Sequence, residues 1–323
     1  MLWNDRIGRR IKLRDLHIVL AVAQAGSIAR AAKQLAISQP VVSRVIADLE
    51  ATLGVRLFDR SRHGAEPTIF GRSVLDRGVA VFDELKQCVK DLEYLSDPGS
   101  GELRIAGAEP MVAGLIPHII DQISRRFPRI AYHVTQGAAD ASQLRELRAR
   151  NVDLYVGRLP RSFTEQDFDV EILFDEPLLI VAGTQNRWAR RRRIKLADLM
   201  DEPWVLPRLE SAVQTMAREL FRSAGLTLPA KGFIHGPMQM NDALVATGRF
   251  LGIYPGSFLQ NSAKRLSLKV LQVDVPPQSS PVGIVTLKNR AMSPVARLFI
   301  QHARKAGQSM NTHFRRDTRS GEP

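Results

Sequence analysis

Hydrophobic positions between residues 27 and 53 predict two short helices joined by a tight turn. In the second helix the apolar residues recur at intervals of three and four, which places them on one buried face. These residues are Val42, Val45, Ile46, Leu49 and Leu53. The first helix is rich in alanine, whose small side chain lets a neighbouring backbone approach closely. A preceding helix over Leu13–Ala25 is expected to cover this pair with Leu13, Leu16, Leu20 and Ala23.

Polar residues mark the ends of the two helices. Ser27 and Ser38 stand just before them, where a hydroxyl can accept a hydrogen bond from a free backbone N–H. Pro40 falls in the first turn of the second helix, where its missing N–H costs nothing. The turn itself is Leu35-Ala36-Ile37. The stretch is therefore predicted to be a helix-turn-helix.

Three polar residues of the second helix, Gln39, Ser43 and Arg44, lie outside its apolar stripe. Their side chains are donors and acceptors of the kind that contact base edges and phosphates in the major groove. The alternative is an ordinary α-helical core in which these residues are only a solvated face. The residues that follow favour the first interpretation.

The chain continues with an apolar strand, a basic tip and a returning strand, a pattern typical of a β-wing. The segment comprises Leu53-Gly54-Val55-Arg56-Leu57-Phe58-Asp59-Arg60, Ser61-Arg62-His63-Gly64-Ala65 and Glu66-Pro67-Thr68. The runs SQPVVSRVIADLE, LGVRLFDR and PTIFG closely resemble the winged helix-turn-helix of LysR-type transcriptional regulators, and the resemblance continues to about Ala306. The residues predicted to bind DNA are Ser27, Ser38, Gln39, Pro40, Ser43, Arg44, Arg60, Arg62 and His63.

A heptad repeat follows the wing. Its apolar positions step alternately by four and three residues through Val74, Gly78, Val81, Leu85, Cys88, Leu92 and Leu95. Met1–Arg72 carries a net charge of +6, whereas Ser73–Ser96 carries −2, so the basic character ends with the wing. The helix could pack on its own domain, but the narrow stripe favours a coiled coil between two chains. The resemblance places a dimer's linker helix here, with Val74, Val81, Leu85, Cys88 and Leu92 as predicted dimerisation residues.

Strands and helices alternate beyond a hinge-like segment, Asp97-Pro98-Gly99-Ser100-Gly101. The first unit is expected to contain strands Leu103–Ala106, Ala131–Thr135 and Asp153–Val156 and helices Val112–Phe127 and Ala139–Ala149. The second is expected to contain strands Trp204-Val205, Gly232–Ile234 and Gly252–Tyr254 and helices Val213–Ala224 and Met240–Thr247. Strands Pro177–Ala182 and Val270–Val275 would cross between the units, and strand Val282–Thr286 with helix Pro294–Ala306 would return to the first. Such alternation predicts parallel, doubly wound sheets.

The predicted fold class is an N-terminal winged helix-turn-helix plus a linker helix, then a two-lobed α/β effector domain of the periplasmic-binding-protein type. The expected boundaries are residues 1–69 for the DNA-binding domain, 70–96 for the linker helix, 97–101 for the hinge and 102–306 for the effector domain. Lobe I comprises residues 102–178 and 277–306, and lobe II comprises residues 179–276. Residues 307–323 are polar and basic and are expected to be disordered.

Ligands of doubly wound sheets bind beyond the carboxyl ends of the strands, next to helix N-termini. The effector is therefore expected between the lobes, in contact with Gly107, Ala108, Glu109, Gln136, Gly137, Arg158, Arg208, Ser211 and Asn241. LysR-type regulators often carry a Ser or Thr hydroxyl in the first of these loops, whereas this chain has Ala108 and Glu109. Glu109 could be a first-turn residue favoured by the helix dipole or a ligand contact. In the second case a polyhydroxylated or partly cationic effector is favoured over a bare dicarboxylate.

Patterns of catalytic and metal-binding residues are absent from the sequence. It contains no GxSxG, HExxH, Walker or GxGxxG motif, and its seven histidines are scattered. Asp175-Glu176 and Asp201-Glu202 precede prolines and are interpreted as turns. We therefore predict that the protein is not an enzyme and that it binds no cofactor and no metal.

Composition agrees with this picture. The chain has 323 residues, 44% of them hydrophobic and 24% charged, and a net charge of +13, which favours polyanionic partners. Its one cysteine, Cys88, excludes an intramolecular disulfide. Neither a signal peptide nor a membrane span is recognised, so the expected location is the bacterial cytoplasm. The basic run Arg187-Trp188-Ala189-Arg190-Arg191-Arg192-Arg193 could be a second nucleic-acid patch, but a solvated loop is the favoured interpretation.

The sequence thus predicts a sequence-specific, effector-responsive transcriptional regulator. The expected partners are double-stranded DNA, an unidentified small molecule and further copies of the chain, as a dimer or a dimer of dimers. RNA polymerase is a further candidate partner, and no membrane contact is expected. The alternatives are a solute-binding protein, which the DNA-binding head disfavours, and a nucleoid-associated protein, which would leave the effector domain without a role.

Overall fold

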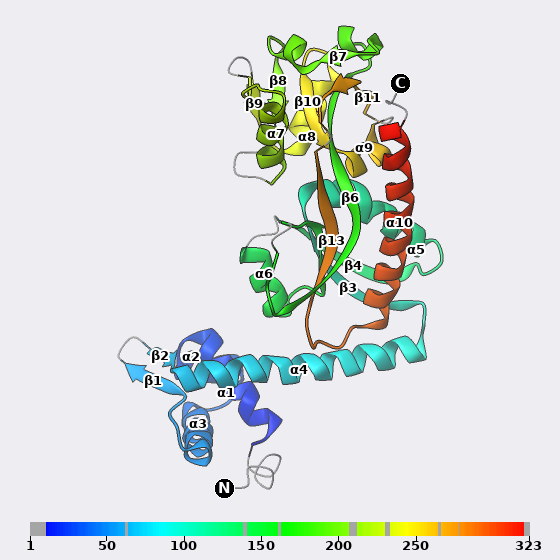
Figure 1. Ribbon diagram of the computed structural model, residues 1–323. Helices are drawn as coiled ribbons and strands as arrows, with labels where there is room; N and C mark the ends of the chain where they lie inside the picture. Colours follow the sequence, from blue (N-terminus) through cyan, green and yellow to red (C-terminus); the bar gives the residue numbers. More distant parts are fainter. Residues whose placement is uncertain are drawn as a thin grey trace. The chain divides into compact units, whose positions relative to one another are not determined.

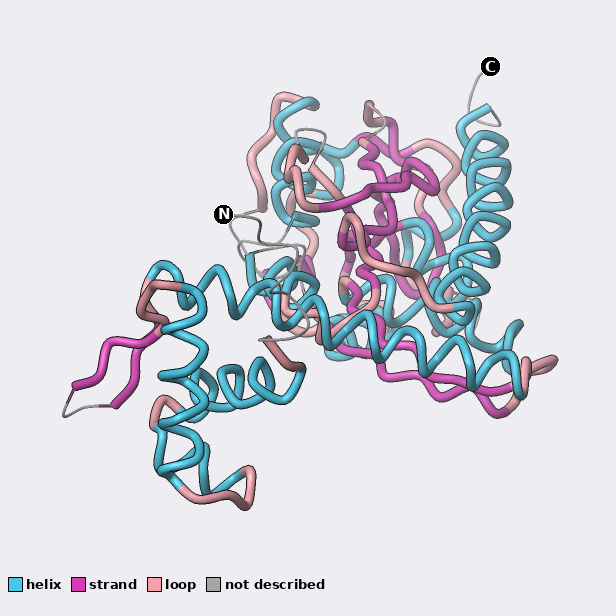
Figure 2. The backbone as a smooth tube through the Cα atoms, turned by 90° about the horizontal axis from the view of Figure 1, so that it is seen from below, coloured by secondary structure: helices cyan, strands magenta, loops and turns pink. Residues whose placement is uncertain are grey.

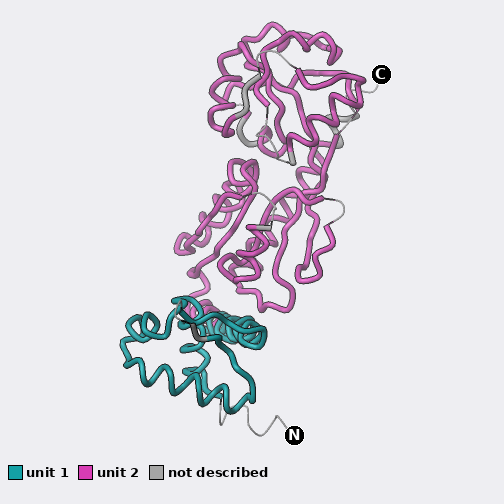
Figure 3. The backbone as a smooth tube through the Cα atoms, turned by 90° about the vertical axis from the view of Figure 1, so that its left-hand side faces the viewer, with its two compact units in different colours: residues 1–89 teal, residues 90–323 magenta. Residues whose placement is uncertain are grey.

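The computed structural model describes residues 11–61, 64–137, 141–160, 163–206, 212–229, 233–263, 266–276 and 278–319. The chain divides into two compact units, Met1–Val89 and Lys90–Pro323 (Figure 3). The division falls inside one long helix. The first part of the predicted linker helix therefore belongs to the N-terminal unit.

The N-terminal unit is helical apart from a two-stranded wing (Figure 2). Its elements are α1 (Leu13–Ala25), α2 (Ile28–Gln34), α3 (Gln39–Leu53), β1 (Phe58–Ser61), β2 (Gly64–Pro67) and the first part of α4 (Ile69–Ser96). Strands β1 and β2 pair antiparallel, with Ser61 opposite Gly64. The predicted helix-turn-helix and wing are confirmed.

The apolar stripe of α3 faces the core of this unit. Val42 and Ile46 have no exposed surface and Leu49 is 2% exposed. Removing each such side chain from water contributes about 1.5–3 kcal/mol. The predicted covering face of α1 is wrong in part, because Leu13 is exposed and the residues that α1 buries are Ile18, Val19, Ala21 and Val22. Leu13 is the first residue of its helix, and the apolar stripe that reaches the core begins one turn later.

The turn between α2 and α3 places Ala36 in the left-handed region, with φ +53°. Ile37 N donates to Ala32 O at 3.0 Å, which closes the end of α2. Ser27 and Ser38 occupy the N-cap positions of α2 and α3 with extended backbones, but neither hydroxyl caps its helix. The capping prediction is therefore wrong, although the helix boundaries that it marked are right.

The wing is attached to the helices on both of its sides. Glu50 Oε1 on α3 accepts hydrogen bonds from Leu57 N at 2.7 Å and Phe58 N at 3.2 Å. Gly71 on α4 lies so close to Leu57, the residue before β1, that a Cβ there would stand 2.0 Å from Leu57 O. Glycine is thus required where α4 passes the start of the wing.

The unit Lys90–Pro323 is built, in the described residues, on a nine-stranded sheet in the order β4-β3-β5-β13-β6-β10-β8-β9, with β11 on β6. In lobe I, β3 (Ser100–Gly107) runs parallel to β4 (Arg129–Gln136) and β5 (Leu154–Arg158). In lobe II, β8 (Trp204–Leu206) runs parallel to β9 (Phe233–His235) and β10 (Leu251–Pro255). Strands β6 (Phe168–Gly183) and β13 (Ser279–Leu287) pair antiparallel and join the two lobes (Figure 1). This is the two-lobed α/β architecture.

The strands that join the lobes differ from the predicted ones. Strand β6 begins at Phe168, nine residues before the predicted start at Pro177. The prediction missed its first half because charged residues interrupt the apolar pattern there. The predicted crossing over Val270–Val275 is wrong, since these residues lie at lobe II edges in β11 (Leu268–Val270), paired with β6, and β12 (Val273–Asp274), paired with β7 (Ile194–Lys195). The second crossing is the start of β13, where Ser279 lies opposite Pro177.

Helices cover the sheet in both lobes (Figure 1). They are the π-helical η2 (Met111–Leu115), α5 (Ile116–Ser124), α6 (Ala141–Arg148), the 3-10 segments η3 (Arg187–Arg190) and η4 (Leu196–Leu199), α7 (Ala212–Ser223), α8 (Met238–Ala246), α9 (Gly256–Ser262) and α10 (Pro294–Arg319). The predicted helix over Val112–Phe127 begins with the π-helical turn. Helix α9 was not predicted, because it is short and follows directly on a strand.

Helix α10 extends well beyond its predicted end at Ala306. Met310 is 3% exposed, and the ring of Phe314 packs against that of Phe174 with centroids 6.1 Å apart. Asn311 Nδ2 donates to Leu173 O at 3.3 Å. The prediction of disorder from residue 307 is therefore wrong up to Arg319. The buried Met310 and the half-buried Phe314 pack in the core cluster of lobe I and hold this otherwise polar segment in place.

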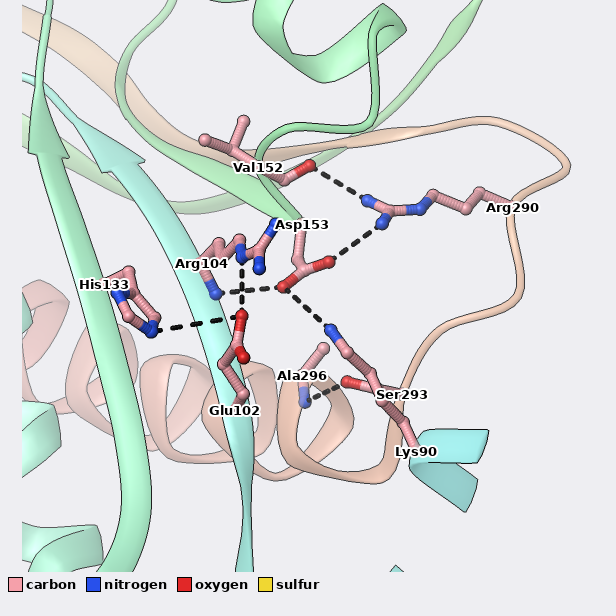
Figure 4. A network of polar contacts seen from close by, with 9 residues as sticks. All are labelled: Lys90, Glu102, Arg104, His133, Val152, Asp153, Arg290, Ser293 and Ala296. Carbon is pink, nitrogen blue, oxygen red and sulfur yellow. Dashed lines mark hydrogen bonds and ion pairs between the residues drawn. The ribbon is translucent and has the colours of Figure 1, made fainter. Parts of the chain in front are cut away.

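A polar network connects the last turns of α4 with lobe I (Figure 4). Asp153 accepts hydrogen bonds from Arg104 N and Arg290 Nη2, both at 2.9 Å, and its carboxylate lies 3.9 Å from Lys90 Nζ. The side chain of Asp153 is 8% exposed. This carboxylate therefore joins α4, β3, β5 and the loop before α10.

The predicted hinge begins as a structured turn, and its last two residues, Ser100 and Gly101, already belong to β3. Arg129 Nη2 lies 2.6 and 2.7 Å from the two carboxylate oxygens of Asp97, and Gly99 N donates to Asp97 Oδ1 at 3.1 Å. These hydrogen bonds, led by the one from Arg129, hold the pKa of Asp97 below its usual value.

Candidate DNA interface and effector cleft

Helix α3 carries polar side chains outside its buried stripe. Ser38, Gln39, Pro40 and Arg44 are exposed, and Ser43 is half-buried. Pro40 lies in the first turn of the helix, as predicted. Exposed amide, hydroxyl and guanidinium groups on one helix can donate to phosphates and base edges together.

The other predicted DNA-binding residues lie around this helix. Ser27 is half-buried at the start of α2, and Arg60 lies in wing strand β1. Arg62 and His63 fall outside the described residues.

The seam of α4 is unevenly buried. Gly78 packs against Leu20 of α1, and Val74 is half-buried against the core of the N-terminal unit. From there on the seam is exposed, at 39% for Val81, 44% for Leu85 and 58% for Leu92, and Cys88 is exposed as well. The single chain therefore leaves most of this apolar stripe without cover.

Glu109 makes a polar contact between the lobes. It follows β3 of lobe I, and its Oε1 accepts a hydrogen bond from Met238 N at 2.9 Å. Met238 is the first residue of α8 in lobe II, and Pro237 before it supplies no side-chain cap. A carboxylate at the N-terminus of a helix is favoured by the helix dipole. Glu109 of lobe I thus interacts with the N-terminus of a lobe II helix.

A buried charged cluster forms a second connection. Arg158, at the end of β5, is 6% exposed and donates from Nε to Glu176 Oε2 at 2.7 Å. Glu176 has no exposed surface, and its Oε1 accepts from both N and Oγ of Ser257 on α9. Nη1 of Arg158 contacts the sulfur of Met216 on α7, and its Nη2 has no hydrogen-bond partner among the residues that the structure describes. Removing either Arg158 or Glu176 would leave the other charge uncompensated at the lobe junction.

The structure brings several predicted effector residues together. Gly137 N donates to Gly107 O at 2.9 Å, and Ala108 N to Val156 O at 3.0 Å, so the loops after β3, β4 and β5 converge. Gln136 is exposed. Asn241 is 8% exposed, and within the described ranges its Oδ1 has no hydrogen-bond partner. Arg208 and Ser211 fall outside the described residues.

Residues that the sequence did not single out complete this region. They are Glu176, Met216, Met238 and Ser257. Asp175-Glu176 was interpreted as a turn, which is wrong because both residues lie inside β6. Burial alternates around this pair, as expected for a strand: Phe174 and Glu176 are buried and Asp175 is exposed.

Comparison with known proteins identifies the family. Residues 13–72 match the bacterial regulatory helix-turn-helix protein family of the lysR type, and residues 96–308 match the LysR substrate binding domain. The chain belongs to the LysR family of transcriptional regulators. It is 28% identical over 315 residues to the HTH-type transcriptional regulator GbpR of Azospirillum brasilense, covering 97% of this chain and 91% of that protein.

Two solved LysR-family structures share the fold. Full-length OxyR of Pseudomonas aeruginosa, in a variant form, has a TM-score of 0.63 and 22% identity, covering 91% of this chain and 95% of that one. Full-length CbnR, in complex with its target DNA, has a TM-score of 0.58 and 23% identity, covering 91% and 99%. The relatives are named as transcriptional regulators, which confirms the prediction of a regulator rather than an enzyme. None of the helices in the described ranges is long and apolar enough to cross a bilayer.

Proposed function

We propose that this LysR-family regulator binds a small molecule between lobes I and II, and that the occupied cleft changes how a dimer engages its operator. The observation that carries this proposal is the hydrogen bond from Met238 N to Glu109 Oε1. It joins a strand end of lobe I to a helix N-terminus of lobe II, which is where ligands of such sheets bind. A ligand that separates or replaces these groups shifts the balance between lobe arrangements.

The proposed DNA contacts are Gln39, Ser43 and Arg44 in the major groove, with Ser27, Ser38 and Pro40 close to the backbone. Gln39 and Arg44 are exposed and Ser43 is half-buried, whereas Val42 and Ile46 of the same helix are fully buried, and this contrast supports the assignment. The wing residues Arg60, Arg62 and His63 are proposed to contact the backbone or the minor groove.

Dimerisation is proposed to use the exposed part of the α4 seam, from Val81 to Leu92. An apolar stripe at heptad spacing that the single chain leaves uncovered supports this step. The functional division at residues 69, 96 and 101 likewise remains our proposal, as does assembly into a dimer of dimers. A regulator that acts on chromosomal DNA is placed in the cytoplasm, where RNA polymerase is available as a partner.

Glu109 favours an effector with hydroxyl or ammonium groups. Its carboxylate already occupies the N-terminus of α8, so the bare carboxylate of a ligand would compete with it and be repelled. Hydroxyl and ammonium groups can instead donate to its oxygens.

Glu109→Gln tests the proposed function. Once a thermal-shift screen of sugars, polyols, amines and dicarboxylates has identified a ligand, calorimetry should show about 10-fold or larger loss of affinity in the variant, as expected when a charge-assisted hydrogen bond is replaced by a neutral one. DNA affinity without effector should stay nearly unchanged. Equal ligand affinity in both proteins would restrict Glu109 to capping α8.

A further inference from the structure

Positive charge is distributed unevenly in the unit Lys90–Pro323. These residues include 32 Lys and Arg and 24 Asp and Glu, a net charge of +8. The nine residues Arg187–Lys195 contribute six of the basic residues and none of the acidic ones. The rest of the unit therefore carries a net charge of only +2.

The structure holds this segment firmly at both ends. Ala189 is 3% exposed, and Ile194 is 1% exposed and belongs to the core of lobe II. Arg191 N donates to Trp188 O at 3.0 Å, and β7 pairs with β12. The four arginines between these anchors, Arg190–Arg193, are all exposed. We call Arg190–Arg193 the arginine segment.

Two acidic residues near the segment are engaged elsewhere. Glu202 pairs with Arg187 and also accepts from Trp188 Nε1 at 2.9 Å. Asp198 Oδ2 accepts from the backbone N of Lys195 at 3.4 Å. In the part of the chain that the structure describes, no ion pair reaches the arginine segment. Four adjacent guanidinium groups repel one another, and a polyanion relieves that repulsion.

We propose that the arginine segment is a second, sequence-independent contact with DNA phosphates, made by lobe II in addition to the contacts of α3. Guanidinium groups match phosphate oxygens bidentately, and all four positions are Arg rather than Lys. Once the N-terminal DNA-binding unit has bound a duplex, the effective concentration of phosphate is raised at any other site of the same chain that can reach the duplex. The segment lies next to β7, at the end of lobe II away from lobe I (Figure 1).

A charge-matched pair of variants tests this contact in the full-length protein. The first replaces Arg190, Arg191, Arg192 and Arg193 with Gln. The control replaces four exposed arginines elsewhere in the unit, Arg126, Arg218, Arg222 and Arg249, and so has the same net charge. Binding to a labelled duplex of arbitrary sequence is measured by anisotropy at several NaCl concentrations, and thermal unfolding checks that both variants are folded.

The first variant should have a shallower dependence of log affinity on log salt, by about 2–4, since each lost phosphate contact contributes roughly 0.9. The control should keep the wild-type slope. An unchanged slope in the first variant overturns the proposal and leaves an acidic protein surface as the alternative partner. An equal change in both variants also overturns it, because the effect would then be one of net charge.

Hydrogen exchange supplies a measurement that does not depend on affinity. In the wild-type chain, peptides that cover Arg187–Lys195 should exchange more slowly when the duplex is bound. In the variant with four glutamines this protection should disappear, while protection of α3 is retained. Absence of protection in the wild-type segment at saturating duplex contradicts the proposal.

Discussion

At the scale of single residues, Ala36 has a backbone conformation that favours glycine. Its φ of +53° lies in the left-handed region, where a Cβ costs about 1 kcal/mol or more. The side chain is exposed, so no packing is lost on removing it. Ala36→Gly should therefore raise the free energy of unfolding of the N-terminal unit by about 1 kcal/mol, as measured by urea denaturation.

A matched substitution separates this effect from the general cost of glycine. Ala47 is exposed within α3, where glycine lowers stability by about 1 kcal/mol. Ala47→Gly should thus destabilise the unit while Ala36→Gly stabilises it. Two changes of the same sign would show that the strain at Ala36 is not energetically significant.

Arg44 is the residue of α3 whose removal distinguishes base contacts from phosphate contacts. Arg44→Ala should weaken binding to the cognate site by about 1–3 kcal/mol if the guanidinium contacts a base. A phosphate contact would weaken binding to all sequences alike. Fluorescence anisotropy measures the affinity for an operator selected from a random library and for a scrambled duplex. The control is Arg14→Ala, which removes an exposed arginine of α1.

At the scale of elements, α4 changes its surroundings along its length. Its first turns pack on the N-terminal unit, whereas Leu85 is 44% exposed on the seam. Leu85→Asp should raise the dimer dissociation constant by roughly 100-fold or more, since burying unpaired carboxylates in an apolar interface costs several kcal/mol. Sedimentation velocity measures the effect. Lys86→Asp, exposed beside the seam, should remain dimeric, and a fully dimeric Leu85→Asp protein would place the interface elsewhere.

Elements with a simple period were predictable from the sequence, and those with a mixed period were not. The stripe Val42, Ile46 and Leu49 has one helical period and a single buried face, and α3 was located correctly. Strand β6 alternates but carries acidic residues on both of its faces, among them the fully buried Glu176. The buried charge of Glu176 is compensated by Arg158 and Ser257, which are 18 and 81 residues away in sequence. Pairings of that kind follow from the fold and leave no local signal.

Contacts of Glu109 were unpredictable for the same reason. Its position at the start of a helix suggested a role in the dipole of that helix, yet its partner is Met238, 129 residues later. The loops after β3, β4 and β5 were expected to lie together because the ends of parallel strands converge, and their hydrogen bonds agree with this. The lobe II group that contacts Glu109 depends on the arrangement of the two lobes, and the periodicity of the sequence does not encode that arrangement.

At the scale of the whole effector unit, α10 connects the two lobes. Its first turns pack in the core of lobe I, and its last turns place Phe314 against Phe174 of the joining strand. A Cβ on Gly256, at the start of α9 in lobe II, would stand 2.8 Å from the Phe314 ring and 2.9 Å from Pro177. A change of the angle between the lobes would therefore alter the contacts of the last turns of α10.

A double-mutant cycle between Gly256 and Phe314 measures this connection. Phe314→Ala should lower the stability of the unit by about 1–3 kcal/mol, less than for a fully buried ring because Phe314 is only half-buried. Gly256→Ala should destabilise the wild-type protein through its clash with the ring, and should cost about 1 kcal/mol less in the Phe314→Ala background. Strictly additive effects in thermal unfolding would mean that α10 and α9 do not act on each other. Coupling of the expected sign would show that the end of α10 contributes to the contact between the lobes. A chain truncated after Ala306 should then be cleaved faster between the lobes in limited proteolysis.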